Sequence, residues 1–340
     1  MDTKKSFISV IIPAYQEVKY MRRCLEALVN QTCGLDNFEI IVVDGASTDG
    51  TREIISEFEN KYHNVKLLDN PKKIAPVAMN IGVENARGEF IVRIDAHTQV
   101  NSDYLERCMA AMGKVDADVV GGPMKTRGDG YWGSVISFIL SSIFGVGGSF
   151  RTMNNHNGYV DTVAFGMYRK CTLDEVRHDE RLVRNHDWDL NYRIQQNGGR
   201  VYFDSKIRST YYCADNPIKF LRKAFKDGYW IAAIFYTHSI RHLMPLFFVV
   251  GTIFLAGFCY WRRHGLGNFG YVFFPLIVPM LFYGLTAMFF SLGMIPQIGW
   301  TALVSGPLMY AGFHISRGLG TLYGILAGVW LRVARSKENE

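Results

Sequence analysis

Apolar runs and amphipathic stretches alternate along the first third of the chain. Runs rich in Val, Ile and Phe recur about every 25 to 30 residues, and between them apolar residues stand three or four positions apart, as in helices packed by one face. The runs show no regular polar alternation, which favours strands of a parallel sheet covered on both faces. We therefore expect an α/β fold with strands at Phe7–Ile12, Phe38–Val43, Val65–Leu68, Phe90–Ile94 and Asp118–Gly121.

Carboxylates follow three of these expected strands. The first strand runs into the segment from Pro13 to Glu17, the second ends at Asp44, and the fourth ends at Asp95, two residues before His97. Parallel sheets bind ligands beyond the carboxyl ends of their strands, so we expect these side chains on one rim. Asp49, in the turn after the second strand, is as consistent with a helix N-cap as with ligand binding.

The last third of the chain carries long uncharged runs. Leu243–Trp261, Gly270–Leu292 and Ile298–Ile315 each have the length that a helix needs to cross the hydrocarbon layer, whereas Gly318–Leu331 is short for a span. Three or four membrane segments are therefore predicted, and a buried helical bundle is the alternative. No signal peptide precedes the first strand, so we expect the first domain on the cytoplasmic side.

The average composition conceals this division. The chain has 340 residues and a formal net charge of +6, with a mean hydropathy of +0.03, yet no acidic residue lies between Asp227 and Glu338. Because the basic residues of the first part are mixed with acidic ones, nucleic acid is not expected as a partner. We expect an α/β domain over 1–216, an interfacial amphipathic helix and linker over 217–242, membrane helices over 243–333 and a polar tail over 334–340.

Several segments together resemble one enzyme family. Phe7–Glu17, Ile40–Thr51, Gly88–Thr98 and Arg184–Arg193 are similar in order and spacing to the family 2 glycosyltransferases, which are inverting nucleotide-sugar enzymes of the GT-A fold, a Rossmann-like, mostly parallel sheet. The Arg-x-Asp-Ala-His motif, the segment Val160–Gly166 and the apolar tail resemble the membrane glucosyltransferases of succinoglycan biosynthesis. The likeness covers roughly residues 5 to 235.

The resemblance assigns roles to the donor-binding residues. Pro13, Tyr15 and Glu17 would hold the nucleoside, and Asp44 would accept a hydrogen bond from the base. Asp95 would lie beside the diphosphate and a divalent metal, Mn²⁺ or Mg²⁺, which stabilises the charge of the leaving group.

The sequence departs from the family at two positions. His97 stands where an aspartate is common, and it either ligates Mn²⁺ or contacts phosphate while Asp95 and water hold the metal. Asp187 aligns with the family's catalytic base, but its usual glutamate neighbour is His186. We favour Asp187 over Asp189, which is placed to pair with Arg193 one helical turn away.

The resemblance also implies partners and a location. The chain would move a hexose from a nucleotide-diphosphate sugar, most simply a UDP-sugar, to a polyprenyl-phosphate- or diphosphate-linked saccharide at the cytoplasmic face of a bacterial inner membrane, in contact with its lipid. The alternative is a noncatalytic membrane scaffold or transporter subunit with a degenerate transferase domain. The chain lacks the glycine patterns of dinucleotide-binding enzymes and P-loop NTPases, and the Gln-x-x-Arg-Trp motif of processive synthases, which favours transfer of one sugar per encounter.

Overall fold

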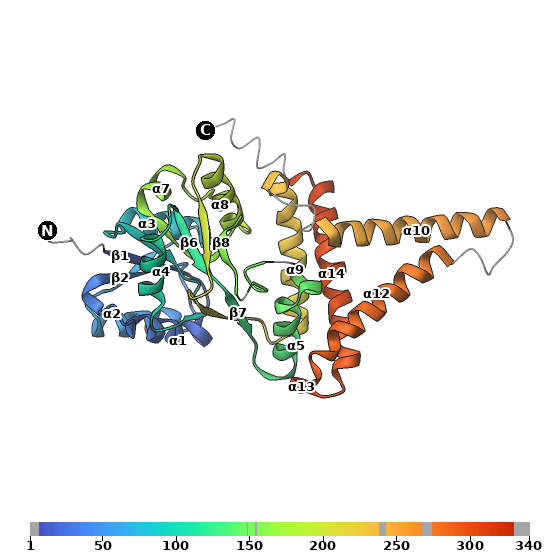
Figure 1. Cartoon of the computed structure of the whole chain (residues 1–340), viewed down its shortest axis with the longest axis horizontal. Coiled ribbons are helices and arrows are strands. Elements are labelled where there is room, and N and C mark those ends of the chain that lie inside the picture. Colours follow the sequence, from blue (N-terminus) through green and yellow to red (C-terminus); the bar gives the residue numbers. More distant parts are fainter. Residues whose placement is uncertain (1–6, 148, 154, 238–242, 267–273, 330–340) are drawn as a thin grey trace. The chain divides into compact units, whose positions relative to one another are not determined.

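The chain folds into two compact units. The computed structural model describes residues 7–147, 149–153, 155–237, 243–266 and 274–329 (Figure 1). The first unit comprises Met1–Thr126 and Ser149–Tyr212, and the second comprises Arg127–Gly148 and Cys213–Glu340. The later segment of the second unit begins at Cys213, three residues before the boundary expected at residue 216. The second unit also includes residues 127–148, which the sequence assigned to the α/β domain.

The described part of the first unit is organised around an eight-stranded sheet. Its strand order is β3-β2-β1-β4-β9-β6-β10-β8, and the pairs β3–β2, β2–β1, β1–β4 and β6–β10 are parallel. β9 and β8 are antiparallel to their neighbours. The strands are β1 (Ile8–Ala14), β2 (Phe38–Asp44), β3 (Val65–Asp69), β4 (Phe90–Arg93), β6 (Val119–Gly122), β8 (Asn157–Tyr159), β9 (Ala164–Arg169) and β10 (Val201–Asp204). The expected mostly parallel sheet is therefore confirmed.

Helices cover this sheet. β2 is buried along its whole length and β1 along nearly all of it, as the absence of polar alternation predicted. Gly82 allows α3 to approach β1 closely, because a Cβ atom at this position would lie 2.4 Å from Ile11 Cγ2. The helices of the first unit are α1 (Val18–Val29), η1 (Leu35–Asn37), α2 (Thr51–Lys61), α3 (Ala75–Asn85), α4 (Tyr104–Met112), α7 (Lys170–Glu175) and α8 (His186–Gln196).

A smaller sheet joins three short strands in the order β5-β11-β7. It consists of β5 (Thr98–Val100), β11 (Ser209–Tyr212) and β7 (Met124–Arg127). The backbone N–H of Tyr212 donates to the carbonyl oxygen of His97, which ties this sheet to the residues that follow β4.

The described part of the second unit is helical. α9 and α14 pack closely because glycines face backbone at their contact: a Cβ atom on Gly320 would lie 2.1 Å from the Phe225 carbonyl oxygen, and one on Gly228 would lie 2.1 Å from that of Arg317. The helices are α5 (Gly130–Ser141), α6 (Ile143–Val146), α9 (Pro217–Ile231), η2 (Ala232–Thr237), α10 (Met244–Leu266), α12 (Phe274–Leu292), α13 (Ile295–Ile298) and α14 (Ala302–Leu326).

The expected membrane segments correspond to α10, α12 and α14. Judged by length and apolar character together, none of the helices in the described ranges meets the requirement for crossing a bilayer. Residues 270–273 of the second expected span, residues 238–242 of the expected linker and the polar tail lie outside the described residues. The structure therefore does not confirm the predicted spans.

Candidate active site

Asp44 ends β2 and is completely buried. Its carboxylate accepts hydrogen bonds from the Ser47 backbone N–H at 2.9 Å and the Ser47 hydroxyl at 2.6 Å, and it pairs with Arg52 at 2.9 Å. Arg52 also pairs with Asp69 at the end of β3, at 2.8 Å. Both oxygens of Asp44 are thus engaged by the chain itself, which fixes the loop after β2. A hydrogen bond from a base to Asp44 stays a prediction.

The loops after β1 and β2 are joined by hydrogen bonds. The backbone N–H of Gln16 donates to the Ser47 hydroxyl at 2.9 Å, and that of Glu17 donates to the Thr51 hydroxyl at 2.8 Å. Asp49 accepts from the backbone N–H groups of Val18 and Thr51, both at 3.1 Å. Asp49 therefore connects the beginnings of α1 and α2, although the N-cap positions themselves are Glu17 and Gly50.

Tyr15 projects from the same loop, and its side chain is 48% exposed. Gly45 lies against it, since a Cβ atom on this glycine would be 3.0 Å from Tyr15 Cδ2 and 3.3 Å from the Lys73 Cα atom. The Lys73 ammonium lies 5.9 Å from the centre of the Tyr15 ring. An exposed ring beside a cation and a close backbone suits a flat ligand with a negative charge.

Left-handed backbone marks this edge of the sheet. Gln16, Ala46 and Lys73, which lie in the loops after β1, β2 and β3, have φ angles of 58°, 58° and 57°, and Asn185, directly before α8, has 59°. Non-glycine residues seldom adopt this conformation, and it concentrates at functional sites. None of the four is a glycine, and only Asn185 is of a type that adopts this conformation comparatively often.

Glu17 and His97 form a pair between the loops after β1 and β4. Glu17 Oε1 lies 2.9 Å from His97 Nδ1. Burial disfavours a charged imidazole, but Tyr211 and the carboxylates of Glu17 and Asp95 raise the pKa of His97 to about 9. His97 is therefore a cation at neutral pH, with its Nδ1–H donated to Glu17.

Arg93 joins two of the predicted site residues. It ends β4, its side chain is 10% exposed, and its guanidinium pairs with Asp95 at 2.8 Å and with Asp187 at 2.5 Å. The Arg93 Nε–H is buried and has no hydrogen-bond partner among the described residues. In the sequence, Arg93 stands out only as part of the Arg-x-Asp-Ala-His motif. Its place in a buried strand also indicates a carboxylate partner, because a buried cation requires one.

Asp187 stands in the first turn of α8, and its side chain is 42% exposed. Burial of its carboxyl opposes ionisation, but the Arg93 guanidinium and His186 hold the pKa of Asp187 well below its usual range. The N-terminus of the helix also favours a negative charge here. Asp187 is thus an ionised carboxylate that remains partly open to solvent, the state in which a group can accept a proton.

Two buried histidines support Asp187. His186 Nδ1 lies 3.1 Å from Asp187 Oδ1 and 3.1 Å from His178 Nδ1. Burial lowers the pKa of both imidazoles, so both are neutral at neutral pH. His186 Nδ1 therefore lies against both the Asp187 carboxylate and the His178 ring.

Asp189 is placed differently. Its side chain is 1% exposed and pairs with Arg193 at 2.8 Å, as predicted. The contacts described above join the other predicted residues in three groups. Asp44 is linked through Ser47 to the loop after β1, and Glu17 is paired with His97. Asp95 is linked through Arg93 to Asp187. Pro13 lies at the end of β1.

The donor set for a metal is incomplete in the chain alone. Across the described ranges, no group of three or more His, Cys, Asp or Glu side chains is arranged to hold a metal ion. Arg93 holds one oxygen of Asp95, which leaves the other for a cation. One carboxylate oxygen together with substrate phosphates is the set that Mg²⁺ commonly takes in proteins, so Asp95 fits a metal brought with a diphosphate.

Comparisons with known proteins agree with this fold and these motifs. Residues 9–172 match the family "Glycosyl transferase family 2". The chain is 29% identical over 232 residues to a dolichyl-phosphate-sugar glucuronosyltransferase of Methanococcus voltae, covering 66% of this chain and 72% of that protein. It is also 29% identical over 244 residues to the succinoglycan biosynthesis protein ExoA of Rhizobium meliloti, covering 70% and 74%.

Comparison with solved structures identifies the fold. A mannosyltransferase of Pyrobaculum calidifontis superposes with a TM-score of 0.64 at 15% identity, over 94% of this chain and 88% of that one. At this identity the likeness establishes the fold, which is GT-A-like. Residues 9–172 therefore form a family 2 glycosyl transferase domain, and the protein is a glycosyltransferase.

Proposed function

We propose that the protein moves a hexose from a UDP-sugar to a hydroxyl group of a lipid-linked saccharide, with inversion at the anomeric carbon. The observation that carries the proposal is the ionised, partly exposed carboxylate of Asp187, which Arg93 links to Asp95. This arrangement supports a base on one side of the reacting sugar and a diphosphate-binding residue on the other.

Asp187 accepts the proton in the proposed reaction. The acceptor oxygen attacks the anomeric carbon, the bond from that carbon to the diphosphate oxygen breaks, and the hydroxyl proton passes to Asp187. A single displacement of this kind inverts the configuration. Arg93 and His186 hold the carboxylate in place and ionised before the reaction.

The loops after β1 and β2 bind the nucleoside in this proposal. Tyr15 offers an exposed ring face for the base, and Pro13 and Glu17 flank it at the end of β1 and the beginning of α1. Asp44 acts through the loop that it fixes, since Ser47 and Arg52 engage its carboxylate. The Pyrobaculum mannosyltransferase was solved in complex with GDP-Man and Mn²⁺, which supports a nucleotide-sugar donor for this fold.

A divalent metal, Mn²⁺ or Mg²⁺, would be held by Asp95 and the donor diphosphate, and it would stabilise the charge of the departing nucleotide. Of the two roles expected for His97, contact with phosphate is favoured over metal ligation, because the raised pKa of His97 keeps both ring nitrogens protonated at neutral pH and a protonated imidazole has no lone pair for a metal. His97 then adds a positive charge beside the diphosphate.

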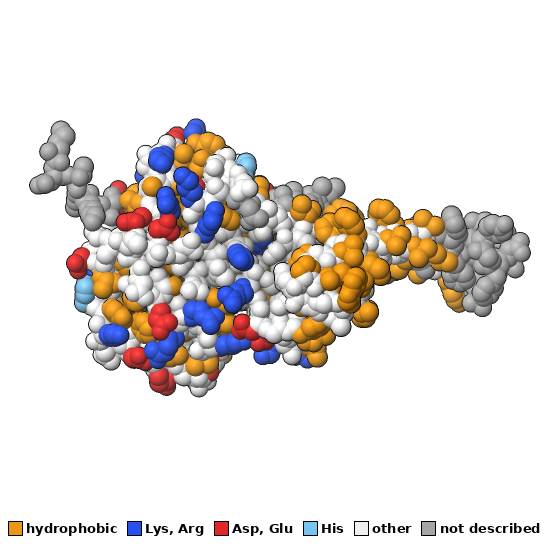
Figure 2. Space-filling model, turned by 60° about the horizontal axis from the view of Figure 1, so that its bottom comes forward, with side chains coloured by type: hydrophobic (Ala, Val, Ile, Leu, Met, Phe, Trp, Pro, Cys, Tyr) orange, Lys and Arg blue, Asp and Glu red, His pale blue; other side chains and the backbone are white. Residues whose placement is uncertain are grey.

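The second unit supports a membrane-bound acceptor. Large apolar side chains are exposed along α10, α12 and α14, and Figure 2 shows the apolar side chains concentrated in the part built by these helices. Examples are Phe254, Phe282, Phe289, Leu308 and Leu326. Apolar surface of this extent marks contact with membrane or protein. On this basis we propose a multi-pass enzyme of the bacterial inner membrane with a cytoplasmic catalytic domain, and the dolichyl phosphate in the name of the Methanococcus voltae relative supports a lipid-linked substrate.

A donor screen tests this proposal. Isolated membranes containing the protein are incubated with radiolabelled nucleotide sugars and a polyprenyl-diphosphate saccharide, and the label entering the lipid phase is counted. We expect one UDP-sugar to label the lipid, and Asp187→Asn membranes to fall to background. If Asp187→Asn membranes label the lipid as well as the wild type does, the assigned base is wrong. If no donor labels the lipid, the proposed reaction is wrong.

A further inference from the structure

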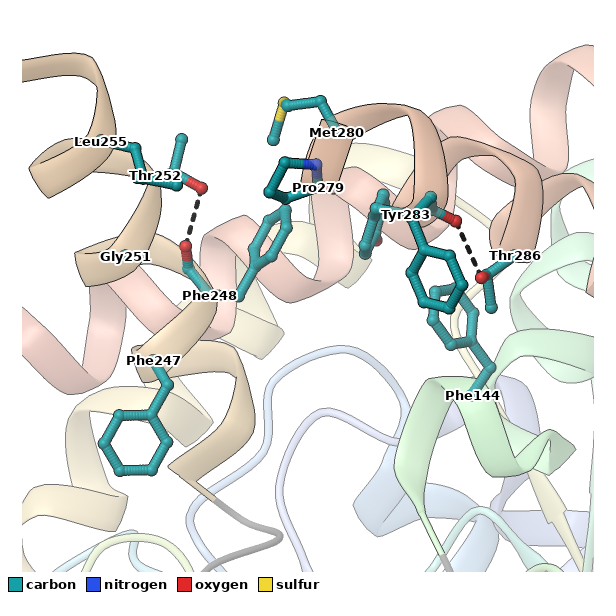
Figure 3. A pocket seen from close by; sticks show the side chains of 11 residues that line it. Phe144, Phe247, Phe248, Gly251, Thr252, Leu255, Pro279, Met280, Tyr283 and Thr286 are labelled. Atoms are coloured by element: carbon teal, nitrogen blue, oxygen red, sulfur yellow. Dashed lines mark hydrogen bonds between the residues drawn. The ribbon is translucent and has the colours of Figure 1, made fainter. Parts of the chain in front are cut away.

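Two adjoining pockets lie within the second unit. One, with a volume of about 350 Å³, opens between α10 and α12, and the other, of about 480 Å³, extends to α14. Phe144, Phe248 and Tyr283 line both. Figure 3 shows the first pocket, with Phe247 and Phe248 on one side and Met280 and Tyr283 on the other. Each pocket has the volume typical of a small-molecule site, and the three side chains that line both place the two apolar pockets next to each other.

The second pocket has a polar end on α14. His314 and Arg317 line it one turn apart. His314 is engaged on both sides, since the Tyr283 hydroxyl lies 2.8 Å from Nδ1 and Nε2 lies 3.4 Å from the Gly145 carbonyl oxygen. These contacts hold α6, α12 and α14 together around the pocket.

Arg317 differs from His314 because part of its guanidinium is unsatisfied. Its Nε–H is buried and has no hydrogen-bond partner among the described residues. Asp227 on α9 acts on Arg317 electrostatically, but from residue 228 to residue 337 the sequence contains no acidic residue. A buried donor on a cation costs free energy unless an acceptor satisfies it, so this end of the pocket is complementary to an anion.

We propose that these pockets bind the phosphate-bearing end of a prenyl lipid, with the phosphate on Arg317 and the first prenyl units along Phe144, Phe248 and Tyr283. The assignment rests on the proposed function, because that reaction uses a prenyl-phosphate carrier. Two adjoining apolar pockets and one cation fit a single chain with one phosphate end. A guanidinium can donate two parallel N–H hydrogen bonds to the oxygens of one phosphate group.

Binding of geranylgeranyl monophosphate to the purified full chain in nonionic detergent tests the proposal, with geranylgeraniol as the matched ligand without phosphate. We expect Arg317→Gln to bind the phosphate about tenfold more weakly, since a charge-assisted hydrogen bond is lost, and to bind the alcohol as the wild type does. Arg317→Lys keeps the cation and should recover part of the affinity.

Two glycines of α10 provide a matched pair for the apolar pockets. Gly251 lines the first pocket and Gly257 does not, and a Cβ atom at either position meets nothing within 4 Å. Gly251→Leu should therefore fill the first pocket and weaken binding of both the phosphate and the alcohol about tenfold, whereas Gly257→Leu should leave both unchanged.

Three outcomes would overturn the proposed lipid site. They are equal binding of geranylgeranyl monophosphate, the probe, by wild type and Arg317→Gln, unchanged probe binding by Gly251→Leu, and displacement of the probe by phosphatidylglycerol at the same concentration. The last result would indicate a general lipid site. UDP binding and sugar transfer are measured on the same preparations. Probe binding without any transfer would count against the proposed reaction alone, and transfer without probe binding would count against the pocket alone.

Discussion

The two units treat their charges differently. In the first unit, the carboxylates of Asp44, Asp95 and Asp187 each have an arginine partner, and Glu17 has His97. The Nε–H groups of Arg93 in the first unit and of Arg317 in the second both lack a partner in the described ranges, but Arg93 pairs with two carboxylates. The second unit also exposes many large apolar side chains. The difference indicates that the first unit is organised by its own contacts before any ligand arrives, whereas the second has surfaces that an outside apolar phase and an anion would satisfy.

Asp187→Asn should have the largest effect on activity. We expect the transfer rate to fall about 10²- to 10⁴-fold, because amide nitrogen and oxygen cannot accept the acceptor's proton, and UDP binding to stay unchanged. Single-turnover transfer and equilibrium UDP binding check the two halves of this prediction. Asp174→Asn is the control, since the Asp174 side chain is exposed and pairs with the nearby Lys170. A loss of UDP binding in Asp187→Asn would place this residue in donor binding instead.

Arg93→Met should have the largest effect on stability. It leaves two carboxylates without their shared buried cation, and we expect the free energy of unfolding to fall by about 3 kcal/mol. Urea unfolding of wild type, Arg93→Met and Arg93→Lys measures this loss of free energy. We expect the unfolding free energy of the lysine variant to lie between those of the other two proteins. An unchanged unfolding midpoint would show that the pair contributes nothing to folding.

The same pair predicts a pH dependence. Because the folded-state pKa of Asp187 is depressed, its stabilisation is complete above its ordinary value of about 4 and is lost as the pH falls below that value. Wild type should therefore lose more of its unfolding free energy between pH 5 and 3 than Arg93→Met does, as urea titrations in this range will record. Parallel losses in the two proteins would contradict the assignment.

Gly320→Val tests whether the second unit can be perturbed by itself. The added side chain meets the Phe225 backbone, which has to move, and we expect a loss of about 2 kcal/mol in the stability of the helical unit. Gly312→Ala on the same helix is the control, because its Cβ atom meets only the end of the Leu221 side chain, at 3.1 Å. Thermal unfolding and UDP binding are measured together. UDP binding should survive in both variants if the first unit is organised independently.

His186→Phe should have the smallest effect. It removes the imidazole that lies 3.1 Å from the Asp187 carboxylate but keeps a ring of similar size, and we expect about a tenfold lower transfer rate with unchanged UDP binding. The pH–rate profile separates a positioning role from simple damage to packing. Its acidic limb should move in His186→Phe if His186 tunes Asp187, and should keep its position if the ring is only a packing element.

The sequence predicted the first unit well because its signals are local. Continuous apolar runs located β1, β2, β3, β4 and β6 to within one or two residues, and the strand ends then located the loops that carry Asp44, Asp95 and His97. Asp187 came from the family motif alone. That Arg93 bridges Asp95 and Asp187 could not be predicted, because the bridge depends on two segments more than 90 residues apart in sequence.

The second unit was predicted less completely for the same reason. Residues 127–148 join it through distant contacts, such as the Tyr131 hydroxyl to Ser305 and the Tyr310 hydroxyl to Ser142, both at 2.8 Å. No local pattern reveals such pairings. The long apolar runs correctly placed helices α10 and α12. α14 instead continues from the third run into Gly318–Leu331, which was expected as a separate short segment, and the burial of these helices in a bilayer stays a prediction.

One measurement tests the central claim most directly: UDP-sugar binding and sugar transfer to a prenyl-diphosphate saccharide, both measured on one purified preparation of Asp187→Asn and one of wild type. The account predicts equal binding by the two proteins and transfer by the wild type only. Equal transfer by the two, or donor binding that disappears together with transfer, would contradict it.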